Sequence, residues 1–580
     1  MNTLVLLFSV CWPLLLVGGL VSKRVRGAAR VLAPWAALPG LLAGTLVATG
    51  APVMEIGWLM LGARLGIDDI ANVLLPVTAG LWLAAGLFAQ RYLESGPRRD
   101  VFFGWFLAAM AGNLLLLVAL DAAVFYLGFA LMSFASYGLV VHAGDQRARH
   151  AGRYYIALVV IGEVCIISAL MMLASSGHID FAALRTVFLE DDATRNNLTI
   201  GLLLVGFGIK AGVFGLHFWL PLAHPVAPAP ASAVLSGAMI KAGLVAWLRL
   251  LPLGDIALPA WGAGLAVAGL FTAYYGVFAG LPQREAKTVL AYSSISQMGL
   301  MTLAIGLGLV FPAHWPLLFA TVLIFMVHHS LVKGGLFLGA GLVQHALSPA
   351  AARLAAVVLS LGALAIAGGP LTGGLVAKLA LKQTAELVAE PWSTSLPMLL
   401  SISSALTTLL MLRFLWLAWP RASAQATRLP FGLYAPWLAL LVAWLAGPWL
   451  VAAPVLRGEA TEGSALWGAS WPLALAGIIA FGAVRLHRRG RLPGLPPVPA
   501  GDIGILLERG VLILGAALND FFSHRLPRRL AVFGRLADRL GRSGPGWSIR
   551  LSHGETRIAI WPMTGLLMLL LAASMAWLLA

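Results

Sequence analysis

Long apolar runs, each long enough to cross a bilayer, constrain this chain more than any other feature. A helix needs about 20 apolar residues to span the hydrocarbon core. The chain is 60% apolar and only 11% charged, far from the roughly 45–50% and about 25% of soluble domains. We therefore expect an all-α polytopic membrane protein. About sixteen transmembrane segments are predicted, near residues 3–21, 31–50, 70–90, 101–119, 122–141, 153–174, 199–218, 229–252, 259–280, 288–309, 315–342, 354–385, 395–418, 430–452, 471–485 and 558–580.

The basic residues predict how these segments are oriented. A net charge of +16 could suggest nucleic acid as a partner, but Lys and Arg fall mostly in short gaps between apolar runs, which is typical of membrane topology, so no nucleic acid is predicted. Loops expected inside carry Arg91, Arg98, Arg99, Arg147, Arg149, Arg153, Arg284, Lys287, Arg421, Arg428 and the basic stretch 485–556. Loops expected outside carry Asp180, Glu190, Asp191, Asp192, Glu386, Glu390, Glu459 and Glu462. Both termini are then expected outside, with the first segment retained because its basic residues follow it.

One sizeable polar region, 486–556, separates the last two predicted spans. It begins with a Pro/Arg-rich linker and then shows apolar residues at helical spacing, opposite a face rich in arginine. This pattern predicts a cytoplasmic interfacial amphipathic helix lying on membrane lipids. A helix docked on a soluble partner is the alternative, and the short apolar run 511–518 leaves a seventeenth crossing open.

Several charged or titratable residues lie inside the apolar segments. A charge at the bilayer centre costs about 2.5 to 3.5 kcal/mol on insertion scales, so a series of them indicates function. A lysine near a span end can instead extend to the interface, which weakens the case for Lys382 and Arg413, and a buried histidine can be a hydrogen-bonded core residue. The residues that predict a proton path are Glu163, Lys210, Lys241, His329, Lys333 and Lys378, with His217, His224, His328, Lys382 and Arg413 in support.

Helix-breaking residues flank two of these lysines. Gly212 and Gly215 follow Lys210, and glycines and a proline at 368–374 precede Lys378. Two broken helices, five segments apart and therefore opposite in direction, predict two inverted five-helix repeats with ion sites near the midplane. The expected organisation is N-terminal helices (1–100), a first repeat (101–252), a second repeat (259–418), C-terminal helices (430–485), the basic segment (486–556) and a last helix (557–580).

The stretch KAGVFGLHFWLPLAHPVAPAPASAVLSGAMIKAGLVAWLR (210–249) resembles a known signature. It is similar to the antiporter-like membrane subunits of complex I, of Mrp cation/proton antiporters and of energy-converting hydrogenases. Further matches lie at 286–300, 329–341 and 370–378, with a weaker one at 66–82, so the resemblance covers roughly residues 60–420. It is closest to the large membrane subunit of hydrogenase-4 and formate hydrogenlyase.

The resemblance implies roles for individual residues. Lys210 and Lys378 would be the two broken-helix lysines, Lys241 the partner of Lys210 toward the middle, and His329 with Lys333 the link between half-channels. Glu163 matches an acidic position of the family's sixth helix. The chain also departs from the pattern: FALMSFASY places Ala130 where the family carries a fifth-helix glutamate, and Leu222 replaces the aspartate of WLPDAH, a change shared by hydrogenase-type members.

The missing glutamate leaves three interpretations: Glu163 replaces it as counter-ion, coupling differs from the respiratory members, or this path is inactive. The leading function is a proton- or cation-translocating subunit of a multisubunit complex, with other membrane subunits and H⁺ or Na⁺ as partners, in a bacterial-type cytoplasmic (inner) membrane. The alternatives are a subunit of an Mrp-type Na⁺/H⁺ antiporter or of an inorganic-carbon uptake complex, and an inactive scaffold. The ion, its direction and the driving partner stay open.

No cofactor or metal is predicted. Cys11 and Cys165 are the only cysteines, too few for an iron–sulfur cluster, and the sequence holds no Rossmann or P-loop fingerprint. An enzyme name on this chain would therefore describe the complex around it.

Overall fold

The computed structural model describes residues 2–505 except 48–52, 58–61, 175–176, 191, 425, 427–429, 492, 494–495 and 497, and beyond residue 505 only 510, 513, 516 and 520. The compact unit Met1–Asp502 contains all the helices discussed below. The predicted amphipathic helix and the predicted last span, 558–580, lie outside the described residues.

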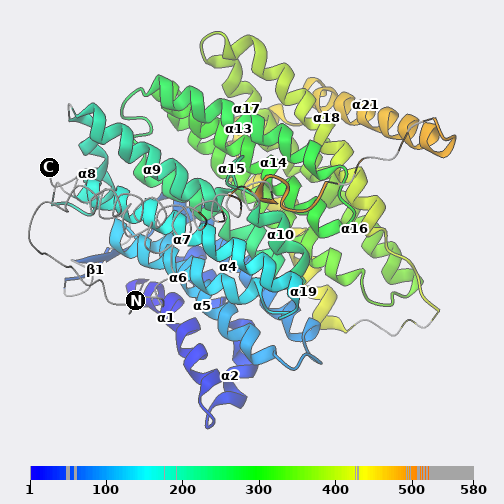
Figure 1. The fold of residues 1–580 in the computed structure, drawn as a ribbon, viewed down its shortest axis with the longest axis horizontal. Coiled ribbons are helices and arrows are strands. Elements are labelled where there is room, and N and C mark those ends of the chain that lie inside the picture. Colours follow the sequence, from blue (N-terminus) through cyan, green and yellow to red (C-terminus); the bar gives the residue numbers. More distant parts are fainter. Residues whose placement is uncertain are drawn as a thin grey trace, which may run out of the picture. The chain divides into compact units, whose positions relative to one another are not determined.

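The first part of the chain, up to the first helix break, is helical apart from one short hairpin (Figure 1). The hairpin strands β1 (Met54–Ile56) and β2 (Ala63–Leu65) are antiparallel, with Met54 opposite Leu65. The helices are α1 (Asn2–Val21), α2 (Arg26–Leu32), η1 (Ala33–Trp35), α3 (Leu38–Leu46), α4 (Asp69–Tyr92), α5 (Arg99–Val118), α6 (Ala122–Val140), α7 (Gln146–Ala174), α8 (Phe181–Thr186), η2 (Val187–Leu189) and α9 (Ala193–Ala211).

The rest of the described chain is helical as well. It comprises α10 (Trp219–Val226), α11 (Ala229–Val234), the π-helical turn η3 (Leu235–Met239), α12 (Lys241–Leu250), α13 (Pro259–Gly280), α14 (Ala286–Val310), η4 (Pro312–His314), α15 (Trp315–Leu342), α16 (Pro349–Ala367), α17 (Gly373–Leu387), α18 (Trp392–Ala418), α19 (Phe431–Val451), α20 (Pro454–Glu459) and α21 (Gly463–Arg488).

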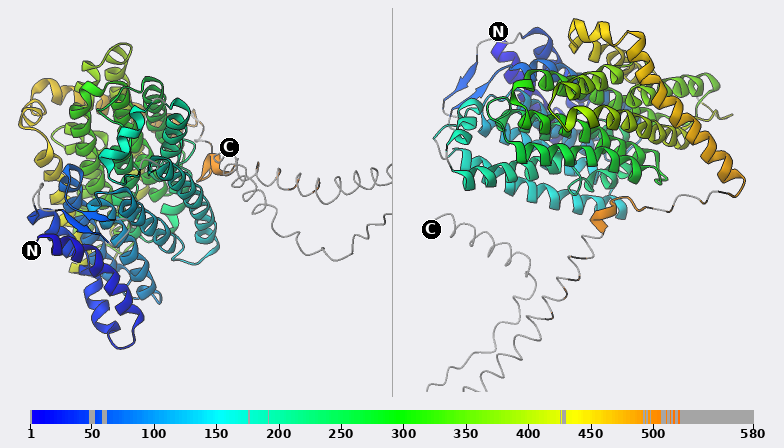
Figure 2. Two further views of the ribbon diagram at one scale, coloured as in Figure 1. Left: turned by 90° about the vertical axis from the view of Figure 1, so that its left-hand side faces the viewer. Right: turned by 90° about the horizontal axis from the view of Figure 1, so that it is seen from above.

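Fourteen helices in the described part of the chain are long and apolar enough to cross a membrane. They correspond to the predicted segments other than the seventh, which is broken between α9 and α10, and the sixteenth, which is not described. The prediction of one continuous segment over 354–385 is wrong: α16 ends at Ala367, where Gly368 takes a left-handed conformation, and α17 begins only at Gly373. The prediction of an all-α, multi-pass integral membrane protein is confirmed, whereas the count of sixteen and the inverted repeats remain predictions. The span Ala229–Leu250 is buried along its whole length, and α21 is mostly exposed at the edge (Figures 1 and 2).

Glycines let several helices approach to backbone contact. On α13, a Cβ at Gly262 or Gly276 would lie 2.7 Å from backbone atoms of α14, and one at Gly269 would overlap the backbone of Leu303. The seven-residue spacing of these glycines keeps them on one helix face. Small residues at such interfaces drive helix association in lipid, where burial of apolar surface between helices gains little. The α13–α14 pair therefore forms a tight core element.

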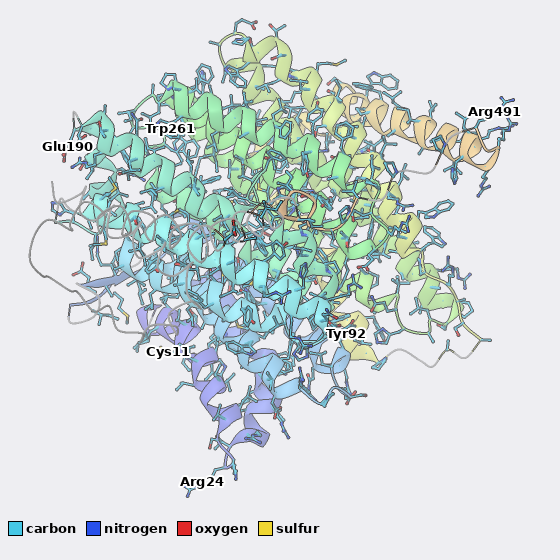
Figure 3. All side chains as sticks on the ribbon, in the orientation of Figure 1. Cys11, Arg24, Tyr92, Glu190, Trp261 and Arg491 are labelled. Carbon is cyan, nitrogen blue, oxygen red and sulfur yellow. The ribbon has the colours of Figure 1, made fainter. Side chains whose placement is uncertain are left out.

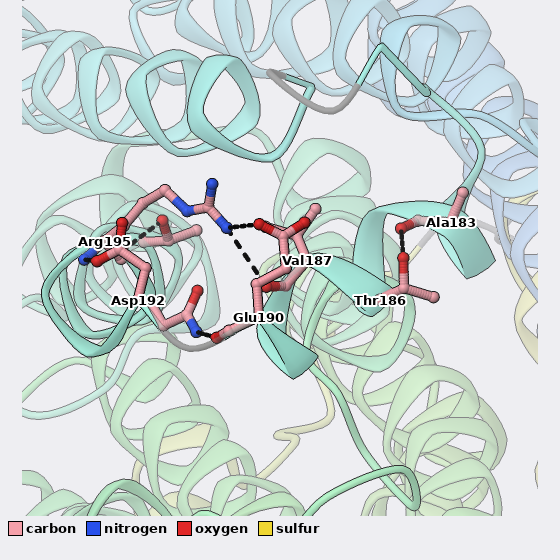
Figure 4. A network of polar contacts seen from close by, with 8 residues as sticks. Ala183, Thr186, Val187, Glu190, Asp192 and Arg195 are labelled. Carbon is pink, nitrogen blue, oxygen red and sulfur yellow. Dashed lines mark hydrogen bonds and ion pairs between the residues drawn. The ribbon is translucent and has the colours of Figure 1, made fainter.

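Polar contacts also fix the start of α9 (Figure 4). The Asp192 side chain accepts a hydrogen bond from the Arg195 backbone nitrogen at 2.9 Å, which caps the helix. The Arg195 guanidinium donates to Glu190 at 2.8 Å and lies 3.4 Å from the Val187 carbonyl. In Figure 3, Glu190 and Arg491 lie on opposite sides of the molecule, in agreement with their expected positions in acidic and basic loops.

Candidate functional site

The first helix break follows Lys210 by two residues. Gly212 ends α9 in the left-handed conformation, with φ 74°, and a Cβ there would lie 2.5 Å from Leu220 Cδ1. Such a cap favours glycine because other residues are strained at positive φ. The Trp219 indole donates to the Ile209 carbonyl at 2.8 Å, which ties the start of α10 back to the end of α9. The predicted break is therefore present.

Lys210 is buried and its direct partner is a tyrosine. The Nζ atom donates to the Tyr155 hydroxyl at 3.1 Å, and that hydroxyl donates in turn to the Ser133 carbonyl at 2.9 Å. The Trp219 ring lies 5.8 Å from the same Nζ atom, within the range of a cation–π contact. These groups replace part of the hydration that a buried ammonium loses.

Glu163, the expected counter-ion, is also buried, with 6% of its surface exposed. It is close enough to Lys210 and to the Tyr126 hydroxyl to interact electrostatically, but no ion pair within 4.0 Å joins it to Lys210 among the described residues. The substitution of Glu163 for the missing fifth-helix glutamate therefore remains a prediction.

Lys241 lies two residues after the end of the π-helical turn η3, with Ile240 between them. A π-helical turn disturbs the regular hydrogen-bond ladder and often marks functional positions. Lys241 Nζ donates to the Ser236 carbonyl within this turn at 2.6 Å, and it lies 2.6 Å from Nδ1 of His329 on α15. Lys241 and His329, both expected on the proton path, are thus buried side chains in direct contact.

The middle of α15 contributes three titratable side chains to this region. His328, His329 and Lys333 are each at most 1% exposed, and Lys333 Nζ donates to the Leu290 carbonyl on α14 at 2.9 Å. Neither ring nitrogen of His328 has a hydrogen-bond partner among the described atoms. No ion pair in the described part of the chain involves Lys241, Lys333 or Lys378.

The second helix break lies before Lys378. Gly368 ends α16 with φ 83°, and the Thr372 side chain caps the start of α17. Lys378 Nζ donates to the Ala367 carbonyl at 2.8 Å and to Ser404 Oγ at 3.1 Å. A cation at the carboxyl end of α16 is favoured by the helix dipole. The two breaks therefore differ. Lys210 lies before the break between α9 and α10, whereas Lys378 lies after the break between α16 and α17, and its side chain reaches back across that break to Ala367.

A cavity of about 400 Å³ opens beside Lys378. Ser404 and Lys382 line it together with three carboxylates from α17 and from the region of α20 and α21, namely Glu386, Glu459 and Glu462. These acidic residues were all predicted in outside loops, so their meeting at one cavity agrees with the predicted loop alternation. The cavity gives Lys378 a polar route to that end of the bundle.

A second cavity, of about 680 Å³, lies at the end of the bundle where α14 begins, and Lys287, Gln344 and His345 are among its lining residues. His224 stacks on Phe337, with ring centroids 4.5 Å apart, and is close enough to Lys287 and Lys333 to interact with both charges. Pro225, the next residue after His224, lines this cavity.

Two other predicted residues have separate settings. Arg413 donates to the Gln283 carbonyl at 2.8 and 3.2 Å and so joins α18 to the loop between α13 and α14. His217 Nε2 lies 3.4 Å from Asp502 Oδ1. Neither contacts the line formed by Lys241, His329 and Lys333. Sequence reasoning missed Tyr155, Ser404 and Asp502, because a hydroxyl in a span or an acid in a linker carries no distinctive pattern.

A multi-pass bundle with buried lysines beside two helix breaks defines the class of antiporter-like membrane subunits. Residues 119–407 match the family model described as NADH:quinone oxidoreductase/Mrp antiporter, TM, and the chain belongs to this group, as its sequence indicated.

Two curated relatives illustrate the relationship. Hydrogenase-4 component B of Escherichia coli (strain K12) is 33% identical over 310 residues, which is 52% of this chain and 45% of that protein. A Na(+)/H(+) antiporter subunit of Bacillus subtilis (strain 168) is 28% identical over 309 residues, 52% of this chain and 62% of that one. The chain thus spans about half the length of the curated relatives it matches.

A solved structure shares the fold. A chain of the Mrp complex from Dietzia sp. DQ12-45-1b aligns with a TM-score of 0.75 at 21% identity, over 95% of this chain and 64% of that one.

Proposed function

We propose that this chain is a proton- or cation-translocating subunit of a multisubunit membrane complex, such as a complex I-like or energy-converting hydrogenase assembly. The observation that carries the proposal is the series of buried groups Lys241, His329, Lys333 and His328, together with the partly buried Lys378. Lysines inside membrane spans are costly to insert, so three buried ones, Lys210, Lys241 and Lys333, with a fourth partly buried at Lys378, indicate a function.

The polar groups around this series support a relay. Ser236 and Ser294 hydroxyls lie 2.7 Å apart between η3 and α14. Ser293, Ser296 and Gln297 on α14 are buried and have side-chain atoms without a partner among the described residues. Bound water ordinarily satisfies such buried polar atoms. Together with the cavities at Lys378 and Lys287, these groups provide steps for protons between the two ends of the bundle.

Other membrane subunits are the partners that we propose, in a bacterial inner membrane. An Mrp-type Na⁺/H⁺ antiporter is the second candidate, favoured by the similarity to the Bacillus subtilis protein. An inorganic-carbon uptake complex and an inactive scaffold are the remaining alternatives. Mass spectrometry of the native complex, purified through a tag on this chain, distinguishes them by the subunits that accompany it.

Lys378 tests whether the path conducts. Replacing it with Met removes the exchangeable proton and lowers the cost of inserting the span, so we expect Lys378→Met to assemble normally but to lose proton movement. Purified native complex in proteoliposomes, under an imposed potential and with an internal pH-sensitive dye, gives the readout. Lys23→Met, at an exposed N-terminal position, is the control and should conduct like the unmodified protein.

A second substitution covers the case in which the Met variant fails to assemble. Lys378→Arg keeps the charge and hydrogen-bond donors, but a guanidinium does not release its proton in this range. We expect this variant to assemble and not to conduct. Undiminished proton movement in either variant would contradict the proposal and favour a scaffold.

A further inference from the structure

Residues 498–502 of the linker after α21 pack against three transmembrane elements, α10, α13 and α14. The Gln283 side chain donates to the Val498 carbonyl at 3.2 Å. Gly501 has φ 90°, and a Cβ there would lie 2.9 to 3.0 Å from the Leu222 side chain on α10. Glycine is therefore required for the linker to approach α10 this closely.

This packing inserts Asp502 into a polar niche of the bundle. The Tyr292 hydroxyl donates to Asp502 Oδ2 at 2.7 Å, Tyr275 interacts with the same carboxylate, and His217 Nε2 lies 3.4 Å from Oδ1. The Asp502 side chain is 8% exposed, and that of His217 is fully buried. Burial raises the pKa of Asp502, but the contacts from His217, Tyr275 and Tyr292 outweigh it and lower this pKa to about 2. Asp502 is thus ionised at neutral pH.

The ionised Asp502 carboxylate therefore faces the fully buried imidazole of His217. His217 lies in the loop between α9 and α10, seven residues after Lys210. Its Nδ1 atom has no hydrogen-bond partner among the described atoms. With a proton on Nε2, which lies 3.4 Å from Asp502 Oδ1, the Nδ1 lone pair can take up one proton and later release that same proton. The histidine returns to its starting state, and no other co-reactant is needed.

We propose that His217 and Asp502 form a proton-uptake pair for the first half of the path, in which His217 carries the proton and the linker supplies the fixed counter-charge. The proposal rests on the proposed translocating function. The titratable groups that interact with Asp502 are His217 from the helix break, Tyr275 from α13 and Tyr292 from α14. Both tyrosines act as hydrogen-bond donors that hold the carboxylate in place, so Asp502 is a positioning residue.

The main experiment removes the charge and keeps the shape. Asp502→Asn, in native complex reconstituted in proteoliposomes, should slow proton movement by about tenfold or more. The pH profile should also shift, because the variant removes the charge that faces His217. Asp502→Glu should restore part of the rate. Asp100→Asn, which removes an exposed carboxylate paired with Arg30 on the protein surface, is the matched control and should change neither quantity.

A double variant tests whether the two residues act in one step. His217→Gln should reproduce the loss, and the combination with Asp502→Asn should be no slower than the slower single variant, because coupled residues are not additive. Additive losses, or an unshifted pH profile, would overturn the proposal.

A structural role of Asp502 is tested separately. Cysteine introduced at the partly buried Ala500 should react with a membrane-impermeant maleimide at the same rate in the otherwise unmodified protein and in the Asp502→Asn variant, which shows that the linker stays in place. In the opposite outcome, Asp502→Asn makes this cysteine more reactive and slows proton movement without shifting the pH profile. Asp502 would then only hold the linker against the bundle, and the proposal fails. Proton movement that is lost in Lys378→Met but unchanged in Asp502→Asn would show that the uptake pair is wrong. The translocating function would still stand.

Discussion

At the scale of single residues, the buried lysines are stabilised mainly by neutral partners. Lys241 has a carbonyl and an imidazole, Lys333 a carbonyl, and Lys378 a carbonyl and a hydroxyl. A neutral amine can keep such hydrogen bonds, whereas an ion pair would hold the lysine in its charged form. These surroundings therefore suit an amine that changes its protonation state.

Glu163 is the carboxylate that influences Lys210, although it forms no close ion pair with it. We expect Glu163→Gln to lower proton movement, because it removes the compensating charge near a buried ammonium. Ala130→Glu, which restores the carboxylate expected from the related pattern, should be tolerated and should partly rescue the Gln variant. Proteoliposome transport measures both effects, and full transport by Glu163→Gln would rule out its role as a substitute.

Tyr155 was not predicted, and it is the direct partner of Lys210. Tyr155→Phe keeps the ring beside Trp219 but leaves Lys210 without this hydroxyl. We expect a loss of about 1 to 3 kcal/mol in stability from the unsatisfied buried donor, seen as a lower melting temperature in detergent. Tyr434→Phe on α19 is the control, because no hydrogen bond of that hydroxyl is seen in the described residues, and an equal loss there would refute a specific role for Tyr155.

At the scale of elements, the sequence located the charged residues because a lysine in an apolar run is unusual, and the break positions because glycines cluster there. It did not reveal the π-helical turn before Lys241, since SGAMIK carries no glycine or proline pattern that separates a π turn from an α turn. Nor could it show that Lys378 would bridge its own break, because that contact depends on how α16 and α17 meet.

Close packing of α13 on α14 gives a matched test on one helix. Gly269→Ala would drive a methyl group into the α14 backbone, and overpacking of this kind costs about 1 to 3 kcal/mol. Gly264, on the same helix, has open space around its Cβ position, so Gly264→Ala should be neutral or slightly stabilising. Thermal unfolding in detergent should separate the two variants, and equal melting temperatures would contradict the packing argument.

At the scale of the whole molecule, hydropathy and loop charge predicted the class of fold, because membrane insertion acts on each segment locally. The positions of Asp502 against α10, α13 and α14 could not be predicted, since the linker lies far along the chain from the helices it contacts. The predicted topology remains to be tested.

Cysteine labelling tests this topology directly. Single cysteines at Ser395 and Ser423, in a chain whose Cys11 and Cys165 are replaced by serine, should label from opposite sides of the membrane. A cysteine in the basic stretch 486–556 should label from the same side as Ser423. Labelling of all three positions from one side, or a C-terminal reporter on the inner face, would contradict the predicted count of spans.

The contact between Lys378 and Ala367 ties the charge of one side chain to the mechanics of a helix junction. A charged amine binds a carbonyl more strongly than a neutral one, and this carbonyl is the last of α16. We therefore expect loss of a proton from Lys378 to weaken the contact between α16 and α17, and its return to strengthen that contact. Proton exchange at this position would then also act on the backbone, at the break between the two helices.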